Sequence, residues 1–260
     1  MRDQIHITPE YARWFPNEVR HSLETMAAHA KLDISKHRNR SLVNACTLTD
    51  DDEQPLKIHF KAYAKRKHAL DGFARRSLGR IEARNLVNFQ RWDIRTPDVV
   101  AWGARRSLGG LASNMSFIIT KSAPETLTLI DYWTGFDQPS DTETRHHVID
   151  ALATQTRQLH AEHFFHQDLK WRNVLIDRQA TLPQVWWIDC PNGYFSRFGP
   201  RQKHGRIKDL ATLDMVARKR CTPEERLRFI QTYLDEPSIT PTVEVWAAAV
   251  DRYRQRRFDR

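Results

Sequence analysis

The sequence HQDLKWRN at residues 166–173 constrains this chain more than any other feature. It places an acid at Asp168, a cation two residues later at Lys170, and an amide five residues after the acid at Asn173. An Asp at this spacing accepts the proton of an attacking hydroxyl, while the Asn reaches back to a Mg²⁺ ion on nucleotide phosphates. Lys170 would place positive charge beside the transferring phosphoryl group. The alternative is a surface turn with a capping Asp, so the flanking sequence has to decide.

The segment after this motif is predicted to be a β-hairpin. Residues 173–177 and 182–189 are short apolar runs joined by a polar turn, and the second run ends at Asp189. In protein kinases the acid at this position belongs to an Asp-Phe-Gly triplet and binds metal. The triplet Asp189-Cys190-Pro191 keeps the acid but lacks the Phe whose packing switches many protein kinases. We expect Asp189 to bind Mg²⁺ with Asn173; the alternative is an ordinary acid at a strand end.

Two helices are predicted on either side of the motif. Residues 141–163 carry apolar side chains near helical spacing, and the end of this helix would deliver His166 and Asp168. His166 is expected to hold the loop through hydrogen bonds rather than to act as an acid or base. The second helix is predicted to start at Lys208, with Asp209 accepting hydrogen bonds from the loop backbone. The alternative for Asp209 is a first-turn acid that complements the helix dipole.

The N-terminal half is expected to supply a nucleotide clamp. Residues 56–63 alternate apolar with polar or basic side chains, which predicts a strand. Lys61, near its end, is the candidate for holding the α- and β-phosphates, with Lys57 and Lys65 as competitors. Glu82 is the only acid inside the helix predicted at residues 78–89. An ion pair between Lys61 and Glu82 would keep the lysine aimed at the phosphates; the alternative is a local salt bridge of Glu82 with a neighbouring Arg.

The glycine-rich loop that usually covers nucleotide phosphates is absent, because the first glycine of the chain is Gly72. The covering loop is instead predicted at residues 36–41, where Asn39 and Ser41 would bind the phosphates together with basic side chains. Asn tolerates the left-handed backbone geometry that glycine otherwise provides. Without glycine, backbone amides approach phosphate less easily, which allows for weak ATP binding.

These segments resemble the bacterial lipopolysaccharide kinase family, whose members phosphorylate Kdo or heptose in the inner core of lipopolysaccharide. The resemblance implies a protein-kinase-like bilobal fold of the α+β class. A small antiparallel-sheet lobe with one key helix would occupy residues 1–122, and a mainly helical lobe would occupy residues 123–260. The motif at residues 166–173 is the most specific part of the resemblance. The other matching segments are residues 60–63, 82–86, 95–103, 116–120, 188–191 and 206–211.

The resemblance implies a kinase that uses ATP and Mg²⁺ to phosphorylate a sugar hydroxyl. Asp168 would be the base, Asn173 and Asp189 the metal ligands, and Lys61 the phosphate anchor. Gln167 stands where protein kinases carry Arg, and no Ala-Pro-Glu follows Asp189. These departures and the short basic span after Asp189 favour a glycan or small-molecule acceptor over a protein. The alternatives are an aminoglycoside-type phosphotransferase, an atypical Ser/Thr protein kinase, and a pseudokinase that acts only as a binding module.

The net charge of +9 predicts an anionic partner. An anionic glycolipid or sugar at the cytoplasmic face of a membrane fits this charge. Residues 252–260 form the densest basic run, which is expected to be either a solvated helix end or a surface that adheres to anionic lipid. No nucleic-acid-binding signature accompanies the charge, so no specific nucleic-acid partner is expected.

The expected cellular compartment follows from the absence of targeting and membrane-spanning segments in the sequence. The N-terminus has no apolar segment of the signal-peptide type, and no apolar run is long enough to span a membrane. The three cysteines are widely spaced and follow no metal-binding pattern, which suits a reducing cytosol. We therefore expect a cytoplasmic protein, with peripheral contact at the inner face of the cytoplasmic membrane as an extension of the glycolipid interpretation.

Overall fold

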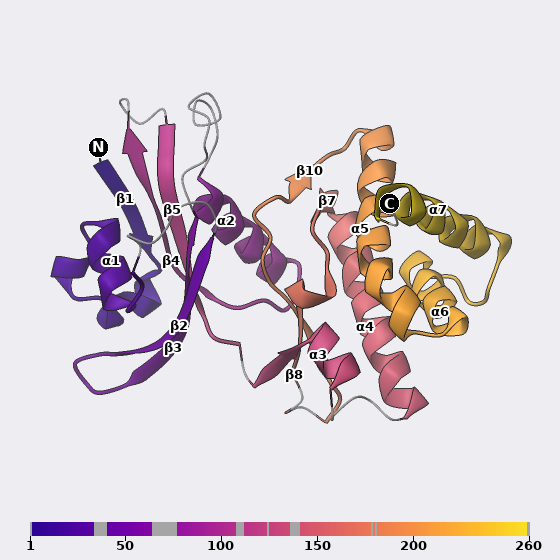
Figure 1. Cartoon of the computed structure of the whole chain (residues 1–260), viewed down its shortest axis with the longest axis horizontal. Helices are drawn as coiled ribbons and strands as arrows, with labels where there is room; N and C mark the ends of the chain where they lie inside the picture. Colours follow the sequence, from indigo (N-terminus) through magenta and orange to yellow (C-terminus); the bar gives the residue numbers. More distant parts are fainter. Residues whose placement is uncertain are drawn as a thin grey trace. The chain divides into compact units, whose positions relative to one another are not determined.

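The structure is a computed structural model that describes residues 2–33, 41–63, 77–107, 112–123, 125–135, 141–177, 179 and 181–258. The chain divides into two compact units, shown with their elements in Figure 1. Unit 1 consists of Met1–Asn88 and Pro97–Ala123, and unit 2 of Phe89–Thr96 and Pro124–Arg260. Within the described residues, none of the helices combines the length and the apolarity that crossing a bilayer requires.

Unit 1 is built on a five-stranded antiparallel sheet with the strand order β1-β4-β5-β3-β2. Three short helices precede β2, and the longer α2 follows β3. The strands are β1 (Arg2–Ile7), β2 (Leu42–Thr49), β3 (Pro55–Tyr63), β4 (Val99–Ser107) and β5 (Ala112–Lys121), and the helices are η1 (Pro9–Trp14), η2 (Asn17–Val19), α1 (Leu23–His29) and α2 (Leu78–Arg91).

The alternation predicted for residues 56–63 is confirmed by β3. Leu56, Ile58 and Phe60 are buried, whereas Lys57 and His59 between them are exposed. Successive side chains of a strand point to opposite faces, so one face of β3 joins the core and the other carries the polar residues. This core also contains Phe15, Leu23 and Met26 from the N-terminal helices.

The helix predicted at residues 78–89 is confirmed as α2, which continues to Arg91. Gly79 in its first turn allows close contact with the sheet. A Cβ atom added at Gly79 would lie 2.1 Å from the carbonyl oxygen of Phe117 in β5, so no larger residue fits without moving the backbone. Glu82 lies one turn after Gly79, and this contact therefore fixes its distance from the sheet.

Unit 2 is mainly helical and contains two small sheets. The core formed by α4, α5, α6 and α7 includes Leu210, Ile230, Tyr233 and Val250. The helices are α3 (Leu129–Thr134), α4 (Thr142–Ala161), α5 (Gly199–Arg220), α6 (Pro223–Leu234) and α7 (Pro241–Phe258). The strands are β6 (Thr126–Thr128), β7 (Phe164–Phe165), β8 (Val174–Asp177), β9 (Gln184–Trp187) and β10 (Tyr194–Phe195), paired in the orders β6-β8-β9 and β10-β7.

The hairpin predicted after the motif is confirmed by the antiparallel pair β8 and β9. The helix predicted at residues 141–163 is confirmed as α4, whose first turn is capped by Asp141. The Asp141 carboxylate accepts a hydrogen bond of 2.6 Å from the backbone N–H of Thr144.

The helix predicted to start at Lys208 begins nine residues earlier, at Gly199, and this part of the prediction is wrong. Pro200 stands in the first turn, where its missing N–H costs no hydrogen bond and its fixed backbone angle suits a helix. As a result, the basic residues between Arg201 and Lys208 lie on a regular helix.

The basic run at residues 252–260 does not form one continuous cationic surface. Arg254 is only 2% exposed, and its Nε donates to Asp214 of α5 at 2.9 Å. Arg252, Arg256 and Arg257 are exposed. Arg254 is therefore not available to a lipid surface, and the adhesion of the tail to lipid stays a prediction that rests on its exposed arginines.

Candidate active site

The motif at residues 166–173 forms a loop, here called the 166–173 loop, which follows β7 and ends in the 3₁₀ turn η6 (Trp171–Asn173). Gln167 adopts a left-handed backbone conformation with φ of 71°, and so does His163 just before β7 with φ of 57°. Residues other than glycine rarely occupy this region, and such strain gathers at functional sites. The conformation persists because buried side chains hold the loop through hydrogen bonds.

Asp209 of α5 is the main partner of the loop. Its carboxylate is fully buried and accepts hydrogen bonds of 2.7 Å from the backbone N–H groups of His166 and Gln167. The same carboxylate lies 3.3 Å from Nε2 of His160, whose Nδ1 is 2.9 Å from the hydroxyl of Tyr233. The loop is therefore tied through one acid to both α4 and α6.

A second contact fixes the side chain of Gln167. Lys208, adjacent to Asp209 on α5, donates from Nζ to Oε1 of Gln167 at 2.8 Å. Gln167 stands where protein kinases carry Arg. Its side chain is held by the ammonium group of Lys208.

The three polar residues predicted to perform chemistry lie together on the loop. Nζ of Lys170 is 2.6 Å from Oδ1 of Asp168, and the two side chains are 38% and 28% exposed. Asn173 is buried, and its Nδ2 donates to the backbone oxygen of Asp168 at 2.8 Å and to Oδ2 of Asp168 at 3.3 Å. Because the amide nitrogen is used in this way, the Oδ1 atom of Asn173 is the one suited to a metal.

Asp189 follows β9 and has a left-handed backbone with φ of 60°. The preceding residue, Ile188, donates its backbone N–H to the backbone oxygen of Asn173 at 3.0 Å. This bond joins the end of the β8–β9 hairpin to the end of the 166–173 loop, and it brings the chain segments of both predicted metal ligands together. An amide oxygen and a carboxylate are the hard donors that Mg²⁺ prefers.

His166 is the buried histidine of the 166–173 loop, and three acidic residues act on its charge. Its ring is fully buried, and its Nδ1 accepts a long hydrogen bond of 3.4 Å from the backbone N–H of Asp168. Burial lowers the pKa of His166 below its usual value, although the charges of Asp209, Asp189 and Asp168 act in the opposite direction. The neutral form of the imidazole is therefore favoured.

No group of three or more His, Cys, Asp or Glu side chains within the described part of the chain has the arrangement of a metal centre. A Mg²⁺ ion in a phosphotransferase needs fewer protein ligands, because substrate phosphates and water complete its coordination. The donor set of Asn173 and Asp189 fits such an ion.

The predicted ion pair of unit 1 is present. Nζ of Lys61 on β3 lies 3.3 Å from Oε1 of Glu82 on α2, and the two side chains are 14% and 4% exposed. Tyr63, two residues after Lys61 and therefore on the same face of β3, donates its hydroxyl to Oε2 of Glu82. The Lys61 ammonium also lies 5.0 Å from the centre of the Tyr63 ring.

Tyr63 was not singled out from the sequence, although its spacing from Lys61 was a usable signal. The competitor Lys57 is exposed on the same strand. Asn39 and Lys65 lie outside the described residues, and Ser41 is exposed directly before β2. The covering loop predicted at residues 36–41 therefore stays a prediction.

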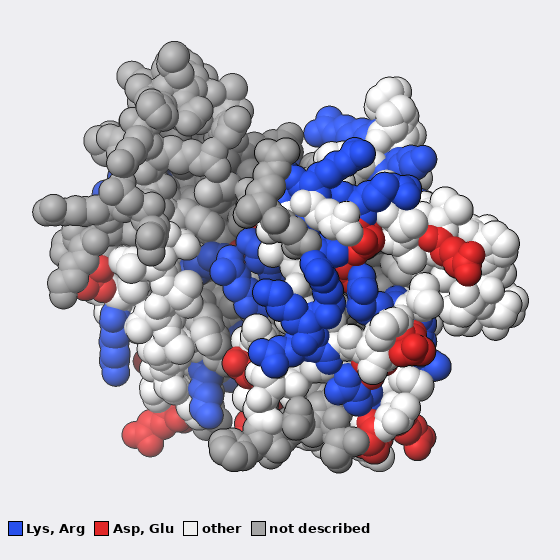
Figure 2. All heavy atoms as spheres, turned by 45° about the vertical axis from the view of Figure 1, so that its right-hand side comes forward, with Lys and Arg blue, Asp and Glu red and all other residues white. Residues whose placement is uncertain are grey.

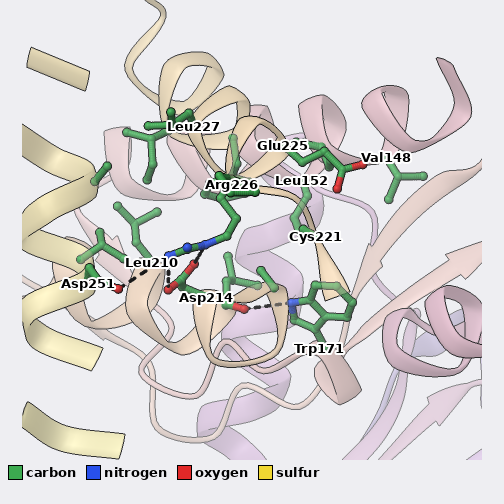
Figure 3. A pocket seen from close by; sticks show the side chains of 18 of the residues that line it. Val148, Leu152, Trp171, Leu210, Asp214, Cys221, Glu225, Arg226, Leu227 and Asp251 are labelled. Carbon is green, nitrogen blue, oxygen red and sulfur yellow. Dashed lines mark hydrogen bonds and ion pairs between the residues drawn. The ribbon is translucent and has the colours of Figure 1, made fainter. Parts of the chain in front are cut away.

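Unit 2 also contains a mostly apolar pocket of about 310 Å³ among its helices, drawn in Figure 3. Trp171 of the 166–173 loop lines it and donates its indole N–H to the backbone oxygen of Leu213 at 2.9 Å. On another wall Arg226 donates to Asp214 at 2.7 Å. Burial raises the pKa of the Cys221 thiol in this pocket to about 12, so the thiol stays protonated. None of the site residues predicted from the sequence lines the pocket.

Comparisons with known proteins bear on the fold and on the family of the chain. Comparison with curated protein sequences gives no match. Among solved structures the chain is similar to WaaP, seen in a structure of WaaP in complex with acyl carrier protein. The TM-score is 0.69 at 19% sequence identity, with 98% of this chain and 99% of that chain covered. This likeness confirms the predicted α+β fold, with an antiparallel sheet and a mainly helical part.

The family assignment rests on the sequence. The sequence model of the lipopolysaccharide kinase (Kdo/WaaP) family matches residues 65–233, which is more than half of the 260-residue chain. The match contains the 166–173 loop, Glu82, Asp189 and Asp209. The chain belongs to the lipopolysaccharide kinase (Kdo/WaaP) family.

Proposed function

We propose that this chain transfers the γ-phosphoryl group of ATP to a hydroxyl of Kdo or heptose in the inner core of lipopolysaccharide. The observation that carries the proposal is the arrangement of Asp168, Lys170 and Asn173 on a loop whose backbone is held by Asp209. In a member of a lipopolysaccharide kinase family, this arrangement supplies a base, a cation and a metal ligand within one short segment.

Asp168 is proposed as the general base. Its partly exposed carboxylate is available to an acceptor hydroxyl, and general-base catalysis contributes roughly a hundredfold to ten-thousandfold in rate. Lys170 pairs with this carboxylate and carries a charge that can also interact with the oxygens of the transferring group. His166 holds the loop as a buried neutral ring.

Asn173 and Asp189 are proposed to hold Mg²⁺. The ion would neutralise charge on the phosphate oxygens as the γ-phosphoryl group leaves. Asn173 contributes its amide oxygen because the amide nitrogen is bound to Asp168, and Asp189 contributes a carboxylate at a strained backbone position. The strain stands against a simple role as a cap at a strand end, because such a cap needs no left-handed conformation.

Unit 1 is proposed to bind the α- and β-phosphates of ATP through Lys61. Glu82 and Tyr63 position the lysine, since both carboxylate oxygens of Glu82 are engaged by Lys61 and Tyr63. The proposal sets the reaction in the cytoplasm, where ATP is supplied.

The proposal is tested by transfer of labelled γ-phosphate from ATP to a panel of acceptors. The panel contains inner-core glycolipids that end in Kdo or heptose, their delipidated oligosaccharides, an aminoglycoside and a generic protein substrate. Label on a core glycolipid, lost in Lys61→Ala but kept in Lys57→Ala on the same face of the same strand, is the expected result. Label only on the aminoglycoside or the protein would overturn the acceptor assignment, and no label on any acceptor would favour a pseudokinase.

We further propose an acyl carrier protein as a protein partner of this chain. The support is the likeness over nearly the full length of both chains to a structure of WaaP in complex with acyl carrier protein. Purification of tagged protein from a native host, followed by mass spectrometry, should find acyl carrier protein in stoichiometric amount. Its absence after purification at low salt would contradict this part of the proposal.

A further inference from the structure

A groove of about 380 Å³ lies between the first turns of α5 and the middle of α7. It shares no lining residue with the apolar pocket and contains none of the proposed catalytic residues. Its lining residues are Gly199, Gln202, Lys203, Arg206, Ile207, Val245, Trp246, Ala249 and Arg252.

The charge of the groove has one sign. Lys203, Arg206 and Arg252 line it, and no Asp or Glu lines it among the residues that the structure describes. Nε of Arg206 is buried and has no hydrogen-bond partner within the described part of the protein. Residues 190–208, which lead into the groove along the chain, also contain no acid. Three cations without a carboxylate among the described lining residues attract an anion.

Two strongly exposed apolar side chains belong to the groove or adjoin it along the chain. Phe198 and Val245, which are 68% and 64% exposed, are the two most exposed large hydrophobic side chains among the described residues. Val245 lines the groove, and Phe198 directly precedes Gly199, which also lines it. Trp246, a residue type enriched at membrane interfaces, is the aromatic side chain of the groove itself.

We propose that this groove docks the protein on a membrane by binding the phosphate headgroup of an anionic phospholipid. Cations that bind the headgroup beside apolar side chains that enter the acyl boundary are the two features of interfacial binding. Figure 2 shows one face of the molecule on which Lys and Arg side chains gather, with Asp and Glu side chains mostly around them. A free anion would leave Phe198 and Val245 without a role, so the phospholipid surface explains more of the groove.

The docking site takes only Arg252 from the terminal basic run. Arg254 of that run is buried in an ion pair and does not contribute. The inference rests on the proposed function in one respect: an acceptor that lies in a membrane requires the enzyme to reach the membrane surface. Binding to vesicles is measured without ATP or acceptor, so the two proposals can fail separately.

The test is co-sedimentation of the whole protein with vesicles of phosphatidylcholine, with and without phosphatidylglycerol, across a salt series. The wild type should bind only the vesicles that contain phosphatidylglycerol, and salt should weaken the binding. Lys203→Gln/Arg252→Gln should weaken it about thirtyfold at low salt, since each basic residue near the surface contributes about fivefold. Phe198→Ser/Val245→Ser should weaken it about tenfold, with little dependence on salt.

The matched control is Lys219→Gln/Arg220→Gln, which removes the same charge from exposed positions at the other end of α5. This variant should bind vesicles within a few-fold of the wild type. Equal losses in both charge variants would mean that net charge alone drives adhesion, and the groove proposal would be wrong.

Two further outcomes separate the proposals. Transfer to a delipidated core oligosaccharide should be the same in the wild type and in Lys203→Gln/Arg252→Gln, because neither residue belongs to the catalytic machinery. If wild-type protein phosphorylates that oligosaccharide but does not bind phosphatidylglycerol vesicles, the docking inference fails and the proposed function stands. If the groove variant keeps vesicle binding but loses binding to purified acyl carrier protein, the groove is a protein-binding site and the lipid assignment is wrong.

Discussion

Substitution of Asp209 by Asn tests how strongly one buried acid holds the 166–173 loop. The side chain keeps its size, but one carboxylate oxygen becomes an NH₂ group that cannot accept a hydrogen bond. One of the backbone N–H groups of His166 and Gln167, each now 2.7 Å from a carboxylate oxygen, therefore loses its acceptor. Asp209 is fully buried, so water does not replace the missing acceptor.

The magnitude follows from these two bonds. A hydrogen bond to a charged group contributes about 1.5–3 kcal/mol, and a buried donor left without an acceptor costs about 1–3 kcal/mol. We expect Asp209→Asn to lower the free energy of unfolding by about 2–3 kcal/mol. The value of kcat should fall as well, because Asp168 follows Gln167 directly and is displaced with it.

The assay is urea unfolding monitored by tryptophan fluorescence, with Asp150→Asn as the control. Asp150 is 32% exposed and pairs with Arg228, which is 40% exposed, so the control should lose less than about 1 kcal/mol. If Asp209→Asn loses no more stability than Asp150→Asn, the bonds from Asp209 do not hold the loop and the reasoning is refuted.

Four further predictions concern individual residues of the site. Asp168→Asn should lower kcat by about a hundredfold or more while nucleotide binding, measured by thermal shift, persists; turnover within a few-fold of wild type would remove Asp168 as the base. Asp189→Ala should abolish Mg²⁺-dependent turnover and Asn173→Ala should weaken it less, because a carboxylate binds a hard cation more strongly than an amide does. Mg²⁺ titrations in which Asn173→Ala loses more turnover than Asp189→Ala would contradict this order. Tyr63→Phe should raise the KM for ATP by about threefold to tenfold, the equivalent of one hydrogen bond, and an unchanged KM would make the hydroxyl structural only. The pKa of His166 is lowered in the folded protein, so its contribution to stability is present above its unfolded pKa of about 6.5 and is lost as the pH falls toward the folded pKa. Urea unfolding at stepped pH should show this loss of stability in the wild type but not in His166→Gln. Parallel pH curves for the two proteins would contradict the prediction.

The sequence determined those parts of the protein whose cause is local. The 166–173 loop could be recognised because its three polar residues must stand at fixed separations to perform their chemistry. β3 could be predicted because burial of one sheet face imposes alternation, and Glu82 could be chosen because α2 carries no other acid in the predicted span. The family resemblance, which the family match confirms, predicted the fold in which these segments belong together.

Contacts between distant segments set which charged side chains are buried and which groups meet. Arg254 looked like one of several exposed arginines, but the packing of α7 on α5 brings it to Asp214, 40 residues earlier in the chain. The start of α5 was placed too late because Gly199 and Pro200 resemble a turn locally, whereas a helix accepts both in its first turn. The hydrogen bond from Tyr63 to Glu82 likewise depends on the contact between β3 and α2. Burial and ion pairing of this kind depend on contacts between distant segments, and the order of residues along the chain does not state those contacts.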